Sequence, residues 1–542
     1  MISINNFSGK STSPRTIYLR YSTNLGEVEK LPTKMNLNGG DMPVFNPATG
    51  ELCGHYLETT QKEYQLAVDK AISASANLRT LPLIDTAEFF TKVIAEIENH
   101  RTALQALLIT YGGKTITEAD VEINEAIKVL ELNATVAFQP NGESFPGLTP
   151  DTILTTHRVP LTDVSGQLGV SNFVLSITLK HLCPSLMAQT SQVVKAAETG
   201  GIPVLDYFKE EIWDKVALNI GRPDLKDSFQ LLIGSASVGQ YLVNDDRIGV
   251  LAITGSSKTF ESINCEFGFK KRIIGEGQGN NIVYVDKSGT DRFFSYMTQA
   301  LWGMGGLRCT TIHQLFYPES NKEEFYNQLK KESFEVFGGL TNPSTVMCSP
   351  VSEKAKNDLK SYVNYYGNQT NVTVETFPMT GLPPEYQSGY FYPLTFLIHN
   401  TLSTMPKLGP FGPVTNVFFY DHDQPNFFNT QFLPYLMGQD YALANAIFSD
   451  CQSKIDQFSM ASKAGVHGIN MPPNGNPVGG QGFGPGTLKS GQNGFGYAAG
   501  YRSHEAYTRK VFTRRFKSPI APSPLSRSFS NVAYKFLQYM PK

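Results

Sequence analysis

The sequence predicts an α/β protein whose sheets are mostly parallel and covered by helices. Strand-like apolar runs alternate with helical patterns through residues 166–257, and a second alternating set follows over 281–421. Alternation of this kind is typical of parallel sheets. The chain has 542 residues, which is too long for one compact core. We therefore expect about two to four domains of ordinary size.

The first expected elements are a hairpin and three helices. Residues 1–40 read as an irregular lead-in, and 44–56 read as a hairpin. Long helices are expected over 64–78, 89–113 and 115–137, where apolar residues recur at helical spacing. Two pairs have the spacing of a capping box at a helix start: Thr60 with Glu63, and Asp85 with Glu88.

Strands and helices then alternate. In the first set, strands are expected within 166–176, 191–197, 229–234 and 247–257, with helices over 178–189, 204–219 and 237–243. In the second set, strands are expected at 281–286, 313–318 and 414–421, with helices over 291–303 and 321–333. Two successive α/β sets of this kind indicate two sheet-containing domains.

Composition excludes several classes of function. Hydrophobic residues make up 41% of the chain, charged residues make up 17%, and the net charge is -2. No long basic or acidic block is present, so nucleic acid and anionic membranes are not expected as main partners. No apolar run approaches the roughly 18 residues of a membrane span, so none is expected.

The six cysteines are scattered, with neither CxxC pairs nor metal-ligand spacing. This pattern fits a reducing compartment, and neither a disulfide framework nor a metal site is expected. The first acidic residue is Glu27, and Lys10, Arg15 and Arg20 precede it among Ser and Thr residues. We expect a cytoplasmic protein, or a mitochondrial matrix protein if this segment is a presequence.

One cysteine stands on a glycine-flanked turn. Cys309, in GGLRCTT, lies between an expected helix and an expected strand. A lone cysteine is often a small buried hydrophobe, and that interpretation suits Cys309 taken alone. The alternative is a nucleophile, because a thiolate is reachable near neutral pH and neighbouring glycines let ligands approach the backbone closely.

A set of short motifs occurs in order along the chain. They are NPATGE at 46–51, GGK at 112–114, SNF at 171–173, VVKAAE at 193–198, TGS at 254–256, GEGQGNN at 275–281, GGLRCTT at 305–311, FGPV at 411–414 and VGGQGF at 478–483. Each is weak alone, but the ordered set, over about residues 40–515, resembles the aldehyde dehydrogenase superfamily. The resemblance implies a Rossmann-type cofactor domain, an α/β catalytic domain and a small β oligomerisation hairpin.

The resemblance also gives Cys309 a chemical role. A thiolate adds to the aldehyde carbonyl, and the resulting thiohemiacetal releases hydride to a nicotinamide. Asn172 matches the amide that stabilises the oxyanion together with the backbone N–H of Cys309, and Glu276 matches the base that activates water against the thioester. Taken alone, Asn172 could be a turn residue and Glu276 a solvated loop carboxylate.

The implied cofactor is NAD. Lys195 and Glu198 match residues that hold the adenosine ribose hydroxyls, and Gly255 with Ser256 match the helix start beside the pyrophosphate. Phe411 matches the aromatic residue of the FGPV motif. The acid at 198 favours a free ribose hydroxyl over a 2′-phosphate, so NAD is expected, with NADP as the alternative. The alternative for Lys195 and Ser256 is a surface lysine and a helix cap.

The chain departs from the family pattern on the nicotinamide side. Gly409 stands two residues before Phe411, where the family usually has a Glu that holds the nicotinamide ribose, and GQG follows Glu276 in place of LGG. We expect weaker nicotinamide binding, and Gly409 is the residue to restore to Glu if the protein proves inactive. The alternative is a catalytically impaired member that serves as a binding or structural oligomer.

The implied substrate is a semialdehyde with an amino acid head. TGSSKTF and VGGQGF resemble 1-pyrroline-5-carboxylate (glutamate semialdehyde) dehydrogenase, the favoured branch, whereas RCTTIHQLF resembles alpha-aminoadipic semialdehyde dehydrogenase. The matching residues are Asp120 for the substrate ammonium, Arg308, Gly475 and Asn476 for its carboxylate, and Phe483 for its aliphatic chain. The two substrates differ by one methylene, which a pocket discriminates by only about 1–3 kcal/mol.

The expected domain plan has three parts. An NAD-binding domain is expected from 30–150 and 170–277, and a catalytic domain over 278–480. Oligomerisation and substrate-loop segments are expected at 151–169 and 481–520. The resemblance implies a homodimer or a larger homo-oligomer.

Overall fold

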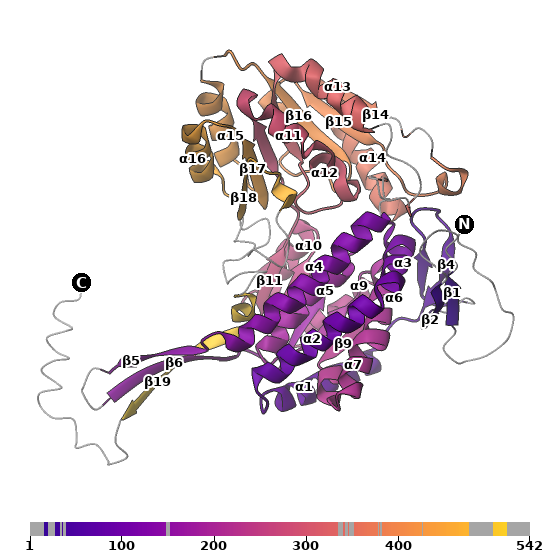
Figure 1. The fold of residues 1–542 in the computed structure, drawn as a ribbon, viewed down its shortest axis with the longest axis vertical. Helices are drawn as coiled ribbons and strands as arrows, with labels where there is room; N and C mark the ends of the chain where they lie inside the picture. The colour runs from indigo at the N-terminus through magenta and orange to yellow at the C-terminus, as the bar shows by residue number, and fades with distance from the viewer. Residues whose placement is uncertain are drawn as a thin grey trace, which may run out of the picture.

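The computed structural model describes most of the chain. It covers residues 39–147, 152–333, 352–377, 382–424, 426–475 and 502–516, with short pieces at 16–19, 28–32, 35, 340–341, 345 and 379. Two α/β bodies lie one above the other, and a narrow β arm extends from the lower body (Figure 1).

The lower body is built on a five-stranded parallel sheet of order β11-β10-β7-β8-β9. Its strands are β7 (Val164–Leu168), β8 (Ser191–Lys195), β9 (Phe229–Leu232), β10 (Ile248–Thr254) and β11 (Arg272–Glu276). Its helices are α1 (Gln61–Leu78), α2 (Leu83–Asn99), α3 (Arg101–Gly112), α4 (Ile116–Ala134), α5 (Val174–Met187), α6 (Gly201–Tyr207), α7 (Asp214–Asn219), α8 (Pro223–Asp227), α9 (Ala236–Asn244) and α10 (Ser257–Phe267). The sheet confirms the first α/β set.

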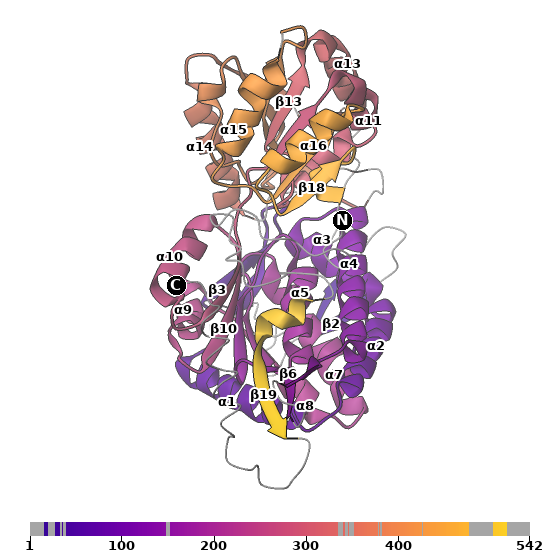
Figure 2. The same cartoon turned by 90° about the vertical axis from the view of Figure 1, so that its left-hand side faces the viewer.

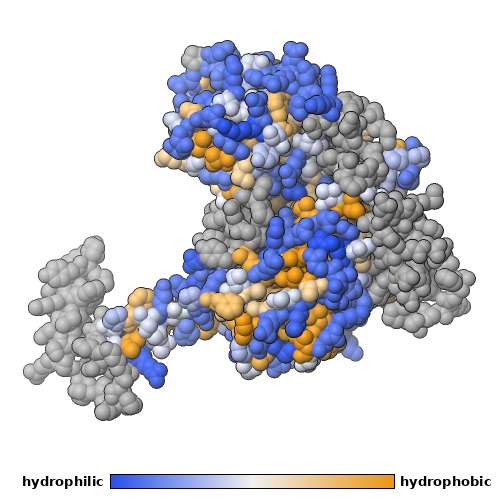
Figure 3. All heavy atoms as spheres, viewed as in Figure 1, coloured by the Kyte–Doolittle hydropathy of each residue, from blue (hydrophilic) through white to orange (hydrophobic). Residues whose placement is uncertain are grey.

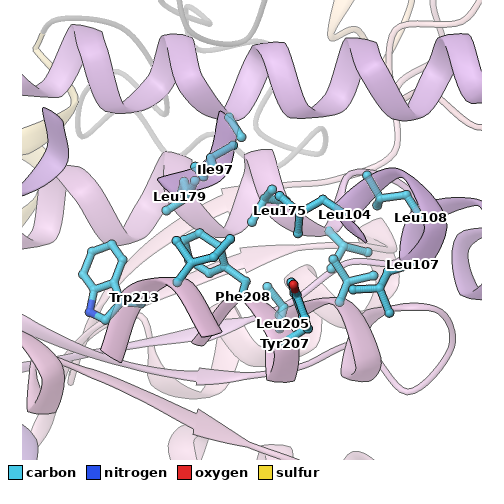
Figure 4. Packing of buried hydrophobic residues seen from close by; sticks show 14 of the residues in the cluster. Ile97, Leu104, Leu107, Leu108, Leu175, Leu179, Leu205, Tyr207, Phe208 and Trp213 are labelled. Atoms are coloured by element: carbon cyan, nitrogen blue, oxygen red, sulfur yellow. The ribbon is translucent and has the colours of Figure 1, made fainter. Parts of the chain in front are cut away.

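Helix α5 lies at the centre of the lower body's core. All fourteen of its residues are buried, so no solvent face exists to give it a helical stripe. Leu175 and Leu179 of α5 pack with Ile97, Leu104 and Phe208 from neighbouring helices (Figure 4). Close packing holds α5 in a fixed position against the sheet. The polar side chains of α5 are therefore held in fixed positions too.

The upper body contains a seven-stranded sheet of order β14-β15-β16-β13-β12-β17-β18. Its strands are β12 (Ile282–Val285), β13 (Gln314–Pro318), β14 (Val372–Phe377), β15 (Leu394–His399), β16 (Val414–Tyr420), β17 (Ala444–Phe448) and β18 (Val466–Ile469). Only the β14–β15 pair is antiparallel among these. Its helices are α11 (Thr290–Phe294), α12 (Met297–Trp302), α13 (Lys322–Ser333), α14 (Glu353–Gly367), α15 (Leu433–Met437) and α16 (Gln452–Ala461).

The arm is a three-stranded antiparallel sheet of order β19-β6-β5. Its strands are β5 (Gly142–Pro146), β6 (Thr152–Pro160) and β19 (Thr508–Phe516), and Figure 2 shows β19 running beside β6 at the base of the lower body. Smaller pairs are β1 (Thr16–Leu19) with β2 (Val28–Pro32), and β3 (Met42–Phe45) with β4 (Leu52–Tyr56).

Several boundaries differ from those expected. The residues of β7, which we placed in the arm, form a central strand of the lower sheet, and β5 belongs to the arm although it falls within 30–150. The long helix expected over 89–113 is two helices that meet at His100. The capping box of Thr60 and Glu63 is confirmed, whereas the one expected at Asp85 is wrong, because α2 begins earlier, after Pro82.

The surface is mixed in character. Most of the upper body is hydrophilic in Figure 3, while apolar patches lie over the helices of the lower body. Among the described helices, none combines the length and the apolar character needed to cross a bilayer. Nor do the described His, Cys, Asp and Glu side chains gather in threes as a metal site would require.

Candidate active site

The carboxyl ends of the parallel strands form one edge of the lower sheet. Register places Lys195 at the end of β8 beside Leu168, and Glu276 at the end of β11 beside Thr254. Open parallel sheets bind ligands at this edge. The predicted cofactor residues and the predicted base therefore lie along the same edge.

Two groups at this edge fit the adenosine half of a dinucleotide. Ser256 is the N-cap of the eleven-residue α10, and its Oγ accepts from the N–H of Thr259 at 3.1 Å. Gly255 is exposed, and a Cβ added there would have no heavy atom within 4 Å, so the helix start is open to an anion. Lys195 Nζ lies 3.3 Å from Glu198 Oε1, which presents an ammonium and a carboxylate side by side for ribose hydroxyls.

The turn before Cys309 has an unusual backbone. Met304, Gly305 and Gly306 have φ values of 59°, 59° and 69°, in the left-handed region. A side chain at 306 would meet Gly412 O at 2.3 Å, so only glycine fits against the FGPV segment there. Met304 is a buried non-glycine residue in this region, which costs about 1 kcal/mol or more and is typical of functional turns.

Asn281 fixes the backbone around the cysteine. Its Nδ2 donates to Cys309 O at 2.7 Å and to Thr311 O at 2.8 Å, and its Oδ1 accepts from Ala444 N at 3.0 Å. Asn281 stood in the GEGQGNN motif without an assigned role. The sequence alone could not predict this role. An asparagine that bonds three remote backbone groups cannot be told from an ordinary loop asparagine before the fold is known.

The Cys309 thiol lies against Glu276. Sγ is 3.3 Å from Glu276 Oε1, although 33 residues separate the two in sequence. The other oxygen, Oε2, pairs with Lys180 Nζ of α5, and 1% of the Lys180 side chain and 2% of the Glu276 side chain are exposed. The predicted nucleophile and base are thus in contact, and Lys180 joins them as a residue that sequence reasoning missed.

Burial raises the pKa of the Cys309 thiol well above its usual value, and the neighbouring Glu276 carboxylate raises it further. The positive charges of Lys180 and Arg308 lower it. The thiol therefore needs a base to lose its proton near neutral pH, and Glu276 Oε1 is at hydrogen-bond distance for that transfer.

Asn172 lies at the same turn. Its Nδ2 donates to Leu307 O at 2.9 Å, two residues before the nucleophile. Lys114 Nζ donates to the backbone oxygen of Asn172 at 2.6 Å and pairs with Glu122 at 3.0 Å, both deep in the interior. The SNF and GGK motifs are thereby tied together, and the predicted oxyanion amide is held against Leu307, on the turn that leads to Cys309.

A cavity of about 640 Å³ lies between α4 and α12, and Arg308, which precedes Cys309 in sequence, lines it, whereas Cys309 itself does not. Arg308 and Glu118 both line it, and each is only 8% exposed. The Arg308 guanidinium lies 5.6 Å from the centre of the Phe173 ring, and its Nη1 is 3.5 Å from Asn474 O. Its Nε is buried without a hydrogen-bond partner among the described residues, so Arg308 retains a donor for a ligand.

Not all predicted substrate residues lie at this cavity. The Asp120 carboxylate accepts from Arg101 at 2.9 Å and from Gln105 at 2.8 Å, on another face of α4. Asp120 therefore does not line the cavity, and the acid of α4 that does is Glu118, two residues earlier. Gly475 directly follows Asn474, whereas Asn476 and Phe483 lie outside the described residues.

The His313 ring lies against Gly409, which the resemblance places on the nicotinamide side. A Cβ at Gly409 would lie 2.2 Å from His313 Cγ, and the oxygen of Gly409 accepts from Gln278 Nε2. His313 is fully buried and accepts from Asn281 N at 3.1 Å. The expectation that a Glu could simply be restored at 409 is wrong, because the His313 ring occupies the place of its side chain. Phe411 packs beside Phe173 and Leu307.

Comparisons with known proteins give a family match over most of the chain. The model of the aldehyde dehydrogenase family matches residues 35–511. "Aldehyde dehydrogenase family 7 member A1" of Pisum sativum is 24% identical over 499 residues, covering 90% of this chain and 93% of its own. A "2,5-dioxopentanoate dehydrogenase" of Saccharolobus solfataricus is 26% identical over 426 residues, covering 76% and 84%.

Solved structures share the fold. That of methylmalonate-semialdehyde dehydrogenase from Oceanimonas doudoroffii has a TM-score of 0.79 at 19% identity and covers 90% of this chain and 96% of its own. That of glyceraldehyde-3-phosphate dehydrogenase from Methanocaldococcus jannaschii, complexed with NADP, has a TM-score of 0.78 at 20% identity, covering 89% and 100%.

Proposed function

This chain belongs to the aldehyde dehydrogenase family, the NAD(P)-dependent oxidoreductases that convert aldehydes to acids, and we propose that its substrate is an amino-acid-derived semialdehyde. Glutamate semialdehyde is favoured, from the TGSSKTF and VGGQGF motifs. The single observation that carries the proposal is the contact of Cys309 Sγ with Glu276 Oε1. Arg308, the residue before Cys309, lines a cavity that Glu118 also lines.

The residues of the chain account for the chemistry as follows. Glu276 takes the thiol proton, and Cys309 Sγ forms a bond to the carbonyl carbon of the aldehyde. The Asn172 amide and the Cys309 N–H stabilise the negative charge on the carbonyl oxygen. NAD, when bound, accepts the hydride that leaves this carbon. Glu276, after passing the thiol proton to solvent, deprotonates a water whose oxygen attacks the thioester. The C–S bond then breaks, which releases the acid and leaves Cys309 as a thiolate that recovers a proton from Glu276.

The proposed cofactor is NAD, with NADP as the alternative. Lys195 and Glu198 would hold the adenosine ribose, and the Gly255–Ser256 start of α10 would receive the pyrophosphate. The Glu198 carboxylate would repel a 2′-phosphate, and this supports NAD. On the nicotinamide side, Gln278 and Gly409 offer only neutral groups.

Two opposite charges in the cavity support a substrate with an amino acid head. Arg308 would pair with the substrate carboxylate, and its unused Nε–H supports that assignment. Glu118 would receive the ammonium group: burial raises the pKa of this carboxyl, and a bound cation would oppose that shift. A plain aliphatic aldehyde would pair with neither of these charges.

The test is NADH formation by the purified full chain with NAD and a panel of aldehydes. The panel contains glutamate semialdehyde, alpha-aminoadipic semialdehyde, succinic semialdehyde and hexanal. We expect turnover to be fastest with glutamate semialdehyde, to be lost in Cys309→Ala and to persist in Cys451→Ala, which removes an exposed thiol. Arg308→Met should raise KM for amino acid semialdehydes far more than for hexanal.

Two results would redirect the proposal. Turnover that is fastest with alpha-aminoadipic semialdehyde would favour the second branch, which the RCTT sequence around Cys309 resembles. No turnover across the panel, with saturating NAD and then NADP, would overturn the dehydrogenase proposal. It would favour a member that binds ligands or assembles without catalysis.

We also propose that the chain forms a homodimer or larger homo-oligomer through its arm. Phe145 of β5 is 43% exposed and Phe512 of β19 is 68% exposed, so the arm carries aromatic side chains on its surface. Both outer strands also have unpaired edges among the described residues, and a second copy could extend the sheet there.

A further inference from the structure

Glu276 divides its carboxylate between two partners of different kinds. One oxygen accepts from the thiol of Cys309, and the other contacts the ammonium of Lys180. Lys180 comes from the middle of α5 and Glu276 from the last residue of β11, 96 positions apart. Both side chains are almost wholly buried, so this ion pair is not a surface contact weakened by solvent.

We propose that Lys180 is a positioning residue that holds the Glu276 carboxylate turned toward Cys309, so that thiol, carboxylate and ammonium form one unit of zero net charge. This inference rests on the proposed function in one respect, namely that the Cys309 thiolate attacks an aldehyde. It assigns to α5 a role in the chemistry that none of the motifs indicates.

Charge balance explains why a cation is needed here. With thiol, carboxylate and ammonium the three groups sum to zero. When the proton moves from Cys309 Sγ to Glu276 Oε1, an S–H bond breaks, an O–H bond forms, and thiolate, carboxylic acid and ammonium again sum to zero. Without Lys180, both states would hold an uncompensated negative charge in the interior, which low polarity strongly disfavours.

The neighbouring charged groups do not replace Lys180. The positive charge of Arg308 also lowers the pKa of Cys309, but the same guanidinium interacts with the carboxyl groups of Glu118 and Glu125. His181, next to Lys180 on α5, bonds Tyr507 through Nδ1 at 3.2 Å, and burial lowers its pKa well below the usual value, so it is neutral. Among the described residues, the cation in direct contact with Glu276 is Lys180.

The test is the pH dependence of Cys309 alkylation by iodoacetamide, followed at the Cys309 peptide by mass spectrometry. The reaction needs neither aldehyde nor cofactor. In Lys180→Met we expect the apparent pKa of Cys309 to rise by about one unit or more, and the alkylation rate near neutral pH to fall about tenfold. In Lys180→Arg, which keeps the charge, we expect a loss of less than about threefold.

Two controls separate chemistry from stability. Lys209→Met breaks another largely buried Lys–carboxylate pair, with Asp214, away from the candidate site. It should lower the melting temperature without changing the Cys309 profile. The exposed Cys265 and Cys451 are internal standards, because their alkylation should be the same in every variant.

Two outcomes would overturn the proposal. The first is a Lys180→Met profile that superimposes on that of the unmodified protein, and the second is an equal loss in Lys180→Arg and Lys180→Met. If Lys180→Met does not fold, Lys180→Gln is judged by the same two criteria. A Lys180-dependent thiol in a protein that oxidises no aldehyde would uphold this inference while the proposed function fails, so the two failures are distinguishable.

Discussion

Gly409 and His313 lie in close contact, and a side chain added at 409 would collide with the ring. The Cβ of any other residue at 409 would lie 2.2 Å from the His313 ring. Burial lowers the pKa of His313 to about 4, so the ring is neutral and packs as part of the core. The departure from the family pattern at 409 therefore involves two residues, because the His313 ring occupies the space that a side chain at 409 would need.

We predict that Gly409→Ala destabilises the upper body by about 1–3 kcal/mol, because overpacking a fixed ring forces the backbone to shift. Denaturant unfolding followed by fluorescence would measure this. Gly239→Ala is the matched control, since its nearest contact would be an ordinary 3.6 Å to Leu168. Equal stability of the two variants would contradict the packing argument, and Gly409→Glu should fold less well than Gly409→Ala.

A second prediction concerns Glu125 of α4. Burial raises its pKa from 4.5 to about 7, although Arg308 opposes the shift. Between these pH values the folded carboxyl keeps a proton that the unfolded chain has lost, so stability falls as pH rises through this window. This group should cost on the order of 3 kcal/mol by about pH 8.

Unfolding measured at about pH 5 and about pH 8 tests this difference. Glu125→Gln should flatten the pH dependence, whereas Glu131→Gln, at an exposed position of the same helix, should leave it unchanged. An equal slope in the Glu125→Gln variant and the unmodified protein would show that Glu125 titrates normally.

At the scale of elements, the sequence predicted most strands and helices of the lower body because their periodic patterns are strong. Helix α5 shows where such patterns end. Every residue of α5 is buried, so its sequence pattern does not predict which way each polar side chain points. The contact of Lys180 with Glu276 could therefore not be predicted. The contact depends on packing between α5 and β11, which is a property of the folded chain.

Helix α4 illustrates a related difficulty. The resemblance pointed to an acid after GGK, and α4 offers Glu118, Asp120, Glu122 and Glu125. Residues two apart point to nearly opposite sides of a helix, so choosing Asp120 in place of Glu118 reverses the direction of the carboxylate. The capping box of Thr115 and Glu118 fixes the helix start and, with it, which acid enters the cavity.

At the scale of the whole molecule, the site is assembled from both bodies. Glu276 and Lys180 come from the lower body, and Cys309 comes from the segment that leads into β13 of the upper body. The ordered motifs predicted this assembly by resemblance. The nicotinamide side could not be predicted, because the effect of Gly409 depends on the position of His313, which is remote in sequence.

The arm gives a prediction about assembly. We expect Phe512→Asp to shift the protein to a smaller species in size-exclusion chromatography with light scattering, because a charge would replace an exposed aromatic side chain at the proposed interface. Thr513→Asp, at the neighbouring exposed position, should have a smaller effect. A monomeric unmodified protein, or an unchanged mass in Phe512→Asp, would contradict the proposed role of the arm.

The β6–β19 ladder also constrains how the protein is made. It joins Thr152–Pro160 to Thr508–Phe516, so β6 is synthesised long before its partner. Until residue 516 has left the ribosome, one edge of β6 has no strand to pair with, and an open edge invites pairing with other chains. Newly made chains thus pass through a stage that needs protection, and any ribosomal pause between β6 and β19 lengthens it.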